Sequence, residues 1–291
     1  MHWKRALLWI SAFAWLLTAI GCGKEAEPFK VGVIPAQNEG NMKQAMERLE
    51  ERLAEGLEKP VEIKIYSDYQ GVVEALKYKK MDMAFLGPLT FVQARETTGV
   101  HAVVTQLIDG KPYYHSYLIV PKESGLDSIE EVAENSKKIR FAFGDPNSTS
   151  GSLIPGMALK KQGVFENEQE HDFKGITYTG SHDVTALSIQ NGKYDVGAID
   201  SAIFNQLVES GKVDKDKVRV IWKSEPLFQY PWAVRKDVDG PTVNKLRKTF
   251  LSIKDPKILN VFGASGFTQA ENSDYESIRR AAKEAGRLEI E

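Results

Sequence analysis

The feature that most constrains this chain is an alternation of strand-type and helix-type patterns. Residues 29–35 (FKVGVIP) and 61–67 (VEIKIYS) alternate apolar and polar side chains and are rich in branched residues, which predicts two strands. Between them, residues 41–57 place apolar side chains at helical spacing. Because short links join these elements, we expect a parallel sheet with helices on its faces.

The same alternation continues through the rest of the chain. Strands or extended segments are predicted over residues 81–87, 116–121, 138–144, 194–200, 218–224 and 231–237. Helices are predicted over residues 69–80, 128–134, 152–163, 186–193, 241–252 and 274–287. This pattern favours two α/β lobes of comparable size, joined by extended segments at about 116–122 and 225–236.

The N-terminal end has the pattern of a secretion signal. Two basic residues precede an uncharged run over residues 6–20, shorter than the roughly 20 apolar residues of a transmembrane helix. The sequence Ala-Ile-Gly-Cys ending at Cys22 resembles a bacterial lipobox, with alanine in place of the usual leucine. We predict a signal peptide over 1–21, a lipid on Cys22 and a tether over 22–28, which would anchor the protein outside the cytoplasmic membrane. A signal followed by an unmodified cysteine is the alternative.

Composition limits the partners of the mature chain. Cys22 is the only cysteine, so internal disulfides are excluded and the hydrophobic core must stabilise the fold. Loss of Lys4 and Arg5 with the signal leaves 36 of the 38 basic residues against 40 acidic ones. This balance gives no general attraction for nucleic acid, so any anion must bind through local groups.

The segment GDPNSTSGSLIPG, residues 144–156, contains the most informative local pattern. Pro155 cannot lie deep inside a helix, so a helix should begin only a few residues before it. Ser148, Thr149 and Ser150 then lie at its N-terminus, where backbone N–H groups are unpaired and the helix dipole favours anions. Three hydroxyl residues followed by a glycine exceed what a helix cap needs. We predict an anion site here, with ordinary capping as the alternative.

Two further groups of side chains fit such a site. His182 precedes a predicted helix and could donate to an anion, or it could be a surface histidine beside a capping Asp183. Tyr69, Tyr114 and Tyr230 lie near strand ends or near the segments that join the lobes. Aromatic side chains at such places can form the walls of a cleft, or they can belong to an ordinary interface core.

Five segments together resemble one known family. They are SDYQGVVEAL, DMAFLGPLTFVQA, GDPNSTSGSLIPG, GSHDVTALSIQNGKYDV and VIWKSEPL. In this order they resemble the phosphonate- and phosphite-binding lipoproteins of ABC importers, from about Phe29 to Trp232. The resemblance implies a type II periplasmic-binding fold, in which two α/β lobes close on a ligand about a two-strand hinge. Lobe 1 would comprise residues 29–117 and 231–291, and lobe 2 residues 118–230.

The resemblance also implies a set of ligand-binding residues. They are Ser148, Thr149 and Ser150 for the phosphonyl oxygens, with Tyr69, Tyr114 and His182. Family members that hold an aminoalkyl ligand use two carboxylates for its ammonium. One of these falls near Asp200, but the other falls near Tyr230, where this chain has no acid. We therefore expect phosphite or methylphosphonate rather than an aminoalkylphosphonate.

The expected function is that of a solute-binding lipoprotein that delivers a small phosphorus oxyanion to an ABC permease, without catalysis or a cofactor. The first alternative is a serine hydrolase using Ser150 and His182. The Gly-x-Ser-x-Gly pattern is absent, however, because Ser148 stands where the first glycine is required. The second alternative is a metal-binding lipoprotein. The four histidines beyond the signal show no close ligand spacing, so no metal is expected.

Overall fold

The computed structural model describes residues 27–37 and 40–288. The predicted signal peptide over 1–21, the lipid on Cys22 and most of the tether over 22–28 lie outside these residues. Within the described ranges, no helix is both long and apolar enough to cross a membrane.

The first lobe is built on a six-stranded sheet with the order β13-β4-β12-β3-β1-β2. Its strands are β1 (Phe29–Val33), β2 (Val61–Ile65), β3 (Met83–Phe85), β4 (His101–Leu107), β12 (Pro231–Val234) and β13 (Gly266–Gln269). Strands β2, β1 and β3 are parallel, as the alternation predicted. The expectation of a wholly parallel sheet was wrong, because β12 and β13 run antiparallel to their neighbours. The chain enters β12 from the other lobe and so runs through the sheet in the opposite direction.

The second lobe contains a five-stranded sheet with the order β10-β6-β9-β7-β8. Its strands are β6 (Ser116–Pro121), β7 (Arg140–Phe143), β8 (Gly175–Tyr178), β9 (Val196–Asp200) and β10 (Val218–Lys223). Strand β7 is parallel to β8 and β9, whereas β6 is antiparallel to both of its neighbours. This sheet is therefore also mixed.

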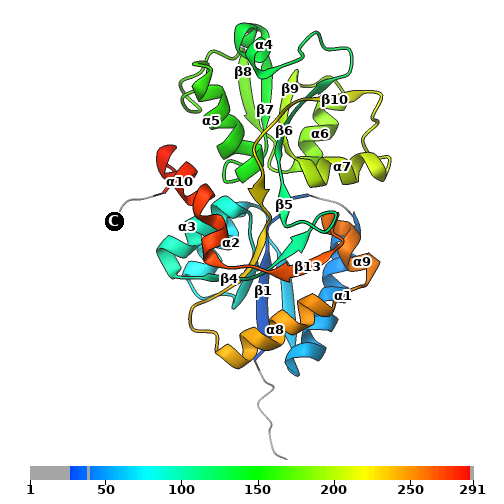
Figure 1. Cartoon of the computed structure of the whole chain (residues 1–291), viewed down its shortest axis with the longest axis vertical. Helices are drawn as coiled ribbons and strands as arrows, with labels where there is room; N and C mark the ends of the chain where they lie inside the picture. The colour runs from blue at the N-terminus through cyan, green and yellow to red at the C-terminus, as the bar shows by residue number, and fades with distance from the viewer. Residues whose placement is uncertain (1–26, 38–39, 289–291) are drawn as a thin grey trace, which may run out of the picture.

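A short two-stranded sheet links the lobes. It pairs β5 (Tyr113–Tyr114) with β11 (Leu227–Phe228) in antiparallel register, between the two larger sheets (Figure 1). The chain passes from lobe 1 to lobe 2 through β5 and returns through β11. The predicted two-lobed fold with a two-strand hinge is confirmed, and β11 lies within the predicted link over 225–236. The predicted first link over 116–122 was wrong, because these residues form β6 of the lobe 2 sheet and the chain crosses earlier, at β5.

Ten α-helices surround the sheets in the described part of the chain. They are α1 (Gly40–Leu57), α2 (Tyr69–Lys77), α3 (Pro88–Thr98), α4 (Ile129–Glu134), α5 (Ile154–Lys161), α6 (His182–Gln190), α7 (Ser201–Glu209), α8 (Gly240–Ser252), α9 (Pro256–Leu259) and α10 (Glu276–Glu284). Helices α8 and α10 pack against α1 and α3 of the first lobe, as expected for a chain that returns there. The sequence patterns had predicted neither α3 nor β4.

Each lobe has an aromatic core, which stabilises the fold without disulfides. In lobe 1, Trp232 is fully buried, with its ring centroid 4.9 Å from that of Phe85 and 5.0 Å from that of Phe250. In lobe 2, Phe141 and Phe143 pack with centroids 4.5 Å apart. Trp232 therefore belongs to the core of lobe 1, although it lies close to the segment that joins the lobes.

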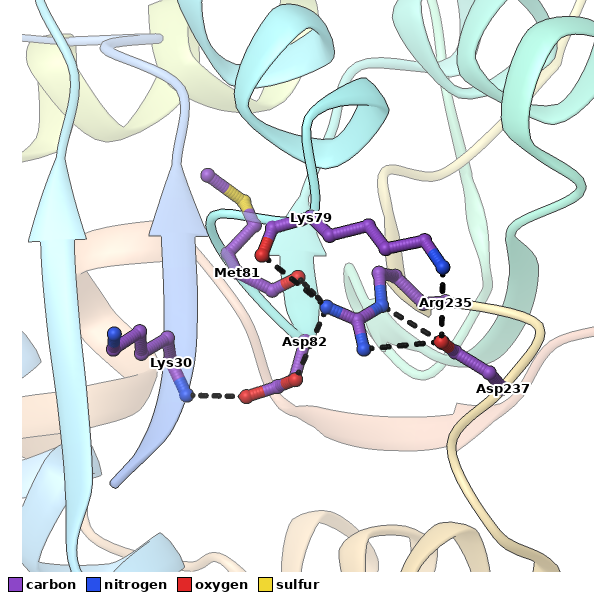
Figure 2. Close-up of polar contacts among 6 residues, drawn as sticks. All are labelled: Lys30, Lys79, Met81, Asp82, Arg235 and Asp237. Carbon is purple, nitrogen blue, oxygen red and sulfur yellow. Dashed lines mark hydrogen bonds and ion pairs between the residues drawn. The ribbon is translucent and has the colours of Figure 1, made fainter. Parts of the chain in front are cut away.

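A polar network fixes the returning strand β12 in lobe 1 (Figure 2). The Arg235 guanidinium, just beyond β12, lies 3.4 Å from the Asp82 carboxylate and donates to Asp237 at 2.8 Å and to the Met81 carbonyl at 3.1 Å. Asp82 also accepts from the Lys30 backbone N–H at 2.9 Å. The network joins the ends of β1, β3 and β12 that lie away from lobe 2. It thereby holds the register that places Tyr230 at the other end of β12.

Candidate functional site

The predicted anion-binding turn lies between β7 and α5. Ser148 caps the first helical turn, and its Oγ accepts from the Gly151 N–H at 3.0 Å. Residues 149–153 form a wide, π-type turn that leads into α5. The Gly144 N–H donates to the Gly151 carbonyl at 2.8 Å, and a Cβ on Gly151 would lie 3.0 Å from the Gly144 Cα. Such a contact is tighter than most, so glycine favours this close approach of the two backbone segments. Ser148, Thr149 and Ser150 are all buried at the predicted helix start.

Backbone hydrogen bonds join this turn and its surroundings to lobe 1. The Leu89 N–H, in the first turn of α3, donates to Thr149 Oγ1 at 2.7 Å. Helix α3 follows Gly87, which supplies no side-chain cap, so Thr149 of the other lobe provides the acceptor for the Leu89 N–H. The His182 N–H donates to the Ala36 carbonyl at 3.0 Å. Since both bonds cross between the lobes, the lobes are closed on each other in this structure.

Three buried tyrosines meet at the junction of the lobes. Tyr69 comes from α2, Tyr114 from the hinge strand β5, and Tyr230 from the segment before β12. The rings of Tyr114 and Tyr230 have centroids 5.4 Å apart. Burial raises the pKa of all three phenols well above the ordinary value, and the nearby Asp200 raises each pKa further. They therefore remain protonated donors at neutral pH.

Tyr69 is the first residue of α2, so the start of the helix predicted over residues 69–80 is confirmed and the placement of Tyr69 at a strand end was wrong. The cap of α2 is Asp68, with Oδ1 accepting from the Gly71 N–H at 2.7 Å. This start directs Tyr69 into the space between the lobes.

Three of the hydroxyls at this junction are buried without a partner in the described part of the protein. They are Tyr69 Oη, Tyr114 Oη and Ser150 Oγ. An unpaired buried polar group costs about 1–3 kcal/mol, and native proteins contain few of them. The three come from lobe 1, the hinge and lobe 2. Ser150 Oγ lies near the Tyr114 and Tyr230 hydroxyls and opposes the rise in their pKa that burial causes, although it forms no hydrogen bond of good geometry with either. Together they form a set of donors suited to an acceptor-rich ligand.

His182 is held in one tautomer. Its Nδ1 lies 3.3 Å from the Asp200 N–H and accepts from it, so the ring proton is at Nε2. Nε2 in turn lies 3.3 Å from Tyr230 Oη. Burial lowers the pKa of His182 to about 4, so the ring is neutral at pH 7. His182 therefore contributes an N–H donor to the junction, without a positive charge.

Asp200 is a buried carboxylate beside this set of donors. It ends β9 and caps α7, with Oδ1 accepting from the Ala202 N–H at 2.7 Å and the Ile203 N–H at 3.1 Å. Burial raises its pKa to about 7, although these backbone bonds oppose the shift. No lysine or arginine is buried anywhere in the described ranges. An anion here would be held by neutral donors.

A small cavity lies beside Asp200 and Tyr230. Its volume is about 20 Å³, which is room for about one water-sized group. Gln37, Gln106 and Gln229 contribute to its walls together with apolar side chains from both lobes. Sequence reasoning did not identify these glutamines, because they come from three distant segments and have no common pattern.

The eight predicted site residues all lie around this one junction. They are Tyr69, Tyr114, Ser148, Thr149, Ser150, His182, Asp200 and Tyr230. Sequence reasoning missed the Leu89 N–H, although Gly87 and Pro88 are a helix-start pair that could have indicated α3.

The geometry does not support the alternative function, a serine hydrolase that uses Ser150 and His182. Both ring nitrogens of His182 face groups other than a serine, and Ser150 Oγ has no hydrogen-bond partner among the described residues. A nucleophilic serine needs its base within hydrogen-bond reach.

Two α/β lobes that close over buried neutral donors, about a two-strand link, define a substrate-binding protein of the periplasmic-binding type. A family model described as "ABC transporter, phosphonate, periplasmic substrate-binding protein" matches residues 31–275. The chain belongs to this family. It is therefore an extracytoplasmic binding component of an ABC transporter and not an enzyme.

Comparison with individual proteins indicates the same class of binding protein. The chain is 28% identical over 272 residues to the probable ABC transporter phosphite binding protein PhnD1 of Prochlorococcus marinus, covering 89% of this chain and 90% of that protein. It is 27% identical to the phosphonates-binding periplasmic protein of Escherichia coli, covering 92% and 79%. The solved structure of PhnD1 in complex with methylphosphonate is 26% identical, with a TM-score of 0.80 and coverage of 89% and 98%. A binding protein component of an ABC phosphonate transporter from Pseudomonas aeruginosa is also 26% identical, with a TM-score of 0.78 and coverage of 89% and 87%.

Proposed function

We propose that this protein binds phosphite or methylphosphonate and delivers it to an ABC permease in the cytoplasmic membrane. The observation that carries the proposal is the convergence of three unpartnered buried hydroxyls, on Tyr69, Tyr114 and Ser150, beside the anion-binding turn. The similarity to a Prochlorococcus protein solved with methylphosphonate supports the same ligand class.

The proposed ligand would complete the hydrogen bonds that the protein lacks. Its oxygens accept from Ser148, Thr149, Ser150 and the backbone N–H groups of the turn, from the two tyrosines and from His182 Nε2. These donors belong to lobe 1, lobe 2 and the hinge, so the ligand can satisfy all of them only when the lobes are closed. Its binding energy therefore favours the closed state over the open one.

The proposed preference for a small substituent follows from the surroundings of Asp200. The cavity of about 20 Å³ beside Asp200 and Tyr230 has room for about one water-sized group, which suits a hydrogen or a methyl group better than an aminoethyl chain. An ammonium brought there would also need carboxylate oxygens, because burial of an unpaired charge is unfavourable. Asp200 Oδ1 already accepts two backbone N–H groups, and Tyr230 provides no acid.

We also propose that Cys22 carries the lipid that anchors the protein. Support for this comes from the sequence, where Cys22 is the only cysteine and ends a signal-type segment. One acyl chain gives only marginal membrane binding, so two or more would be needed for a firm anchor.

A thermal-shift panel with calorimetry of the hits tests the ligand. The compounds are phosphite, hypophosphite, methylphosphonate, 2-aminoethylphosphonate, phosphate and sulfate. A ligand present far above its dissociation constant stabilises the folded state by several kcal/mol, so binding is easily detected. We expect phosphite or methylphosphonate to bind at least about tenfold more tightly than 2-aminoethylphosphonate, a difference of about 1.4 kcal/mol. If 2-aminoethylphosphonate binds most tightly, the argument from Tyr230 and the cavity is wrong.

A further inference from the structure

The last helix, α10, ends in a geometry that fixes the residue after it. Gly286 has a φ of +64°, in the left-handed region that glycine adopts readily. The Gly286 N–H donates to the Lys283 carbonyl at 3.0 Å, and the Arg287 N–H donates to the Ala282 carbonyl at 2.7 Å. This pair of bonds is the Schellman motif, which closes a helix and sets the direction of the following residue. Arg287 is therefore held at a defined place.

The main chain at Arg287 belongs to lobe 1. Helix α10 lies along α3 at the side of the molecule where the two lobes meet (Figure 1). The ring of Tyr275, at the start of α10, packs against Phe91 of α3 with centroids 4.7 Å apart. The carbonyl of Arg287 accepts from Gln93 Nε2, also on α3, at 3.1 Å.

The side chain of Arg287, in contrast, reaches lobe 2. Its Nη2 donates to the Pro146 carbonyl at 2.7 Å and to Asn147 Oδ1 at 3.3 Å. These two residues immediately precede Ser148, the cap of the anion-binding turn. Arg287 thus connects α10 of one lobe to the turn of the other.

The segment that Arg287 holds is continuous with the anion-binding turn. The Asn147 N–H donates to Asp145 Oδ1 at 2.7 Å, and the Ser148 N–H donates to the Asp145 carbonyl at 2.9 Å. Burial raises the pKa of Asp145, and the positive charge of Arg287 acts in the opposite direction. A displacement of Pro146 or Asn147 would therefore shift Ser148 and the hydroxyls after it.

We infer that Arg287 is a positioning residue for the anion-binding turn. It holds the turn from lobe 1 through hydrogen bonds when the lobes are closed. The inference rests on the proposed function only in that the ligand binds at this turn. The bonds to Pro146 and Asn147 join the two lobes, so they break when the lobes open. These hydrogen bonds of Arg287 therefore slow the release of the ligand and have little effect on its entry.

Stopped-flow binding of methylphosphonate tests this inference. Replacing Arg287 by alanine should raise the dissociation rate about fivefold to tenfold, the range expected for a charge-assisted hydrogen bond at a partly exposed place. The association rate should stay within about twofold, because most effects of such changes appear in dissociation. Arg287→Lys should be intermediate, since lysine keeps the charge and loses the planar fork of donors.

Arg280→Ala is the matched control. Arg280 is exposed on α10, so this variant removes the same charge and leaves the bonds of Arg287 to Pro146 and Asn147 in place. An unchanged dissociation rate in Arg287→Ala, or an equal increase in Arg280→Ala, would overturn the inference. So would a loss of several degrees in the ligand-free melting temperature of Arg287→Ala, because that would indicate a purely structural role.

The proposed ligand and the proposed role of Arg287 can be refuted independently. If the wild-type protein does not bind methylphosphonate, the proposed ligand is wrong. The same rate comparison then uses the compound of the panel that raises the wild-type melting temperature most. This substitution is valid because the Arg287 hydrogen bonds stabilise the closed lobes and do not depend on the substituent of the ligand.

Discussion

Replacing Tyr69 or Tyr114 by phenylalanine should weaken ligand binding without lowering the stability of the ligand-free protein. Each hydroxyl is buried and has no partner within the described residues, so neither variant breaks a hydrogen bond of the ligand-free protein. A phosphorus oxyanion would lose one charge-assisted bond in either variant. Such bonds contribute roughly 1.5–3 kcal/mol, so the dissociation constant should rise about tenfold to a hundredfold.

The ligand-free melting temperature should not fall in these variants, because an unpaired hydroxyl is replaced by a group of nearly the same shape. Tyr275→Phe provides the contrast. Tyr275 is equally buried, but its Oη donates to the Gln229 carbonyl at 2.8 Å. Its loss leaves that carbonyl unpaired at about 1–3 kcal/mol, and each kcal/mol lowers the melting temperature by about 2–4 °C in a chain of this size.

Calorimetry and thermal unfolding of the same preparations measure both quantities. Tyr113→Phe is the control for binding, because Tyr113 neighbours Tyr114 in the hinge strand and is 49% exposed. Wild-type affinity in both Tyr69→Phe and Tyr114→Phe would refute the reasoning that the unpartnered hydroxyls serve the ligand. A fall in ligand-free stability as large as that of Tyr275→Phe would show that these hydroxyls have partners within the protein.

Three other predictions test separate parts of the molecule. Burial raises the pKa of Asp200 from 3.8 to about 7, so the folded state binds this proton more tightly than the unfolded chain and its stability falls as the pH rises between these values. Asp200→Asn should therefore raise the ligand-free melting temperature at about pH 8 and leave it nearly unchanged at about pH 4; a parallel shift at both pH values would contradict this. Cys22→Ala should abolish lipid labelling and release the protein from the membrane fraction, whereas equal retention would argue against lipidation. Gly151→Ala places a Cβ 3.0 Å from both the Gly144 Cα and Ser148 Oγ, so it should lower the melting temperature and weaken binding; unchanged calorimetric affinity would mean that the turn can shift to accept the methyl group.

The local elements of the site could be predicted from the sequence because each has a short-range cause. Pro155 limits where a helix can begin, and this places Ser148, Thr149 and Ser150 at the helix start. The resemblance of the motifs to a known family then assigned ligand roles to Tyr69, Tyr114 and His182 and added Asp200. The parallel order of β2, β1 and β3 followed from the alternation of strands and helices.

The contacts that assemble the site were beyond such reasoning because they join residues far apart in the chain. The Leu89 N–H meets Thr149 across 60 positions, and Arg287 meets Pro146 across 141. Neither bond has a sequence pattern, since one donor is a backbone group and the other is one arginine among many. The antiparallel direction of β12 likewise depends on the route of the chain through the hinge, which local periodicity does not contain.

The lack of a buried lysine or arginine among the described residues has a consequence for how the site treats charge. A buried cation would attract any anion, whereas neutral donors such as the tyrosines, the serines and neutral His182 stabilise an anion only where its oxygens meet them. Asp200 is close to the same donors and has a pKa of about 7. A charged carboxylate and a fully deprotonated oxyanion repel each other in a buried space, and a proton held by either one relieves the repulsion. Protonated phosphite and methylphosphonate can supply that proton. Sulfate has none to supply at neutral pH, so with sulfate the proton must come from Asp200 itself. We therefore expect the proposed site to discriminate by protonation as well as by shape, and the measurement with sulfate in the ligand panel tests how strongly.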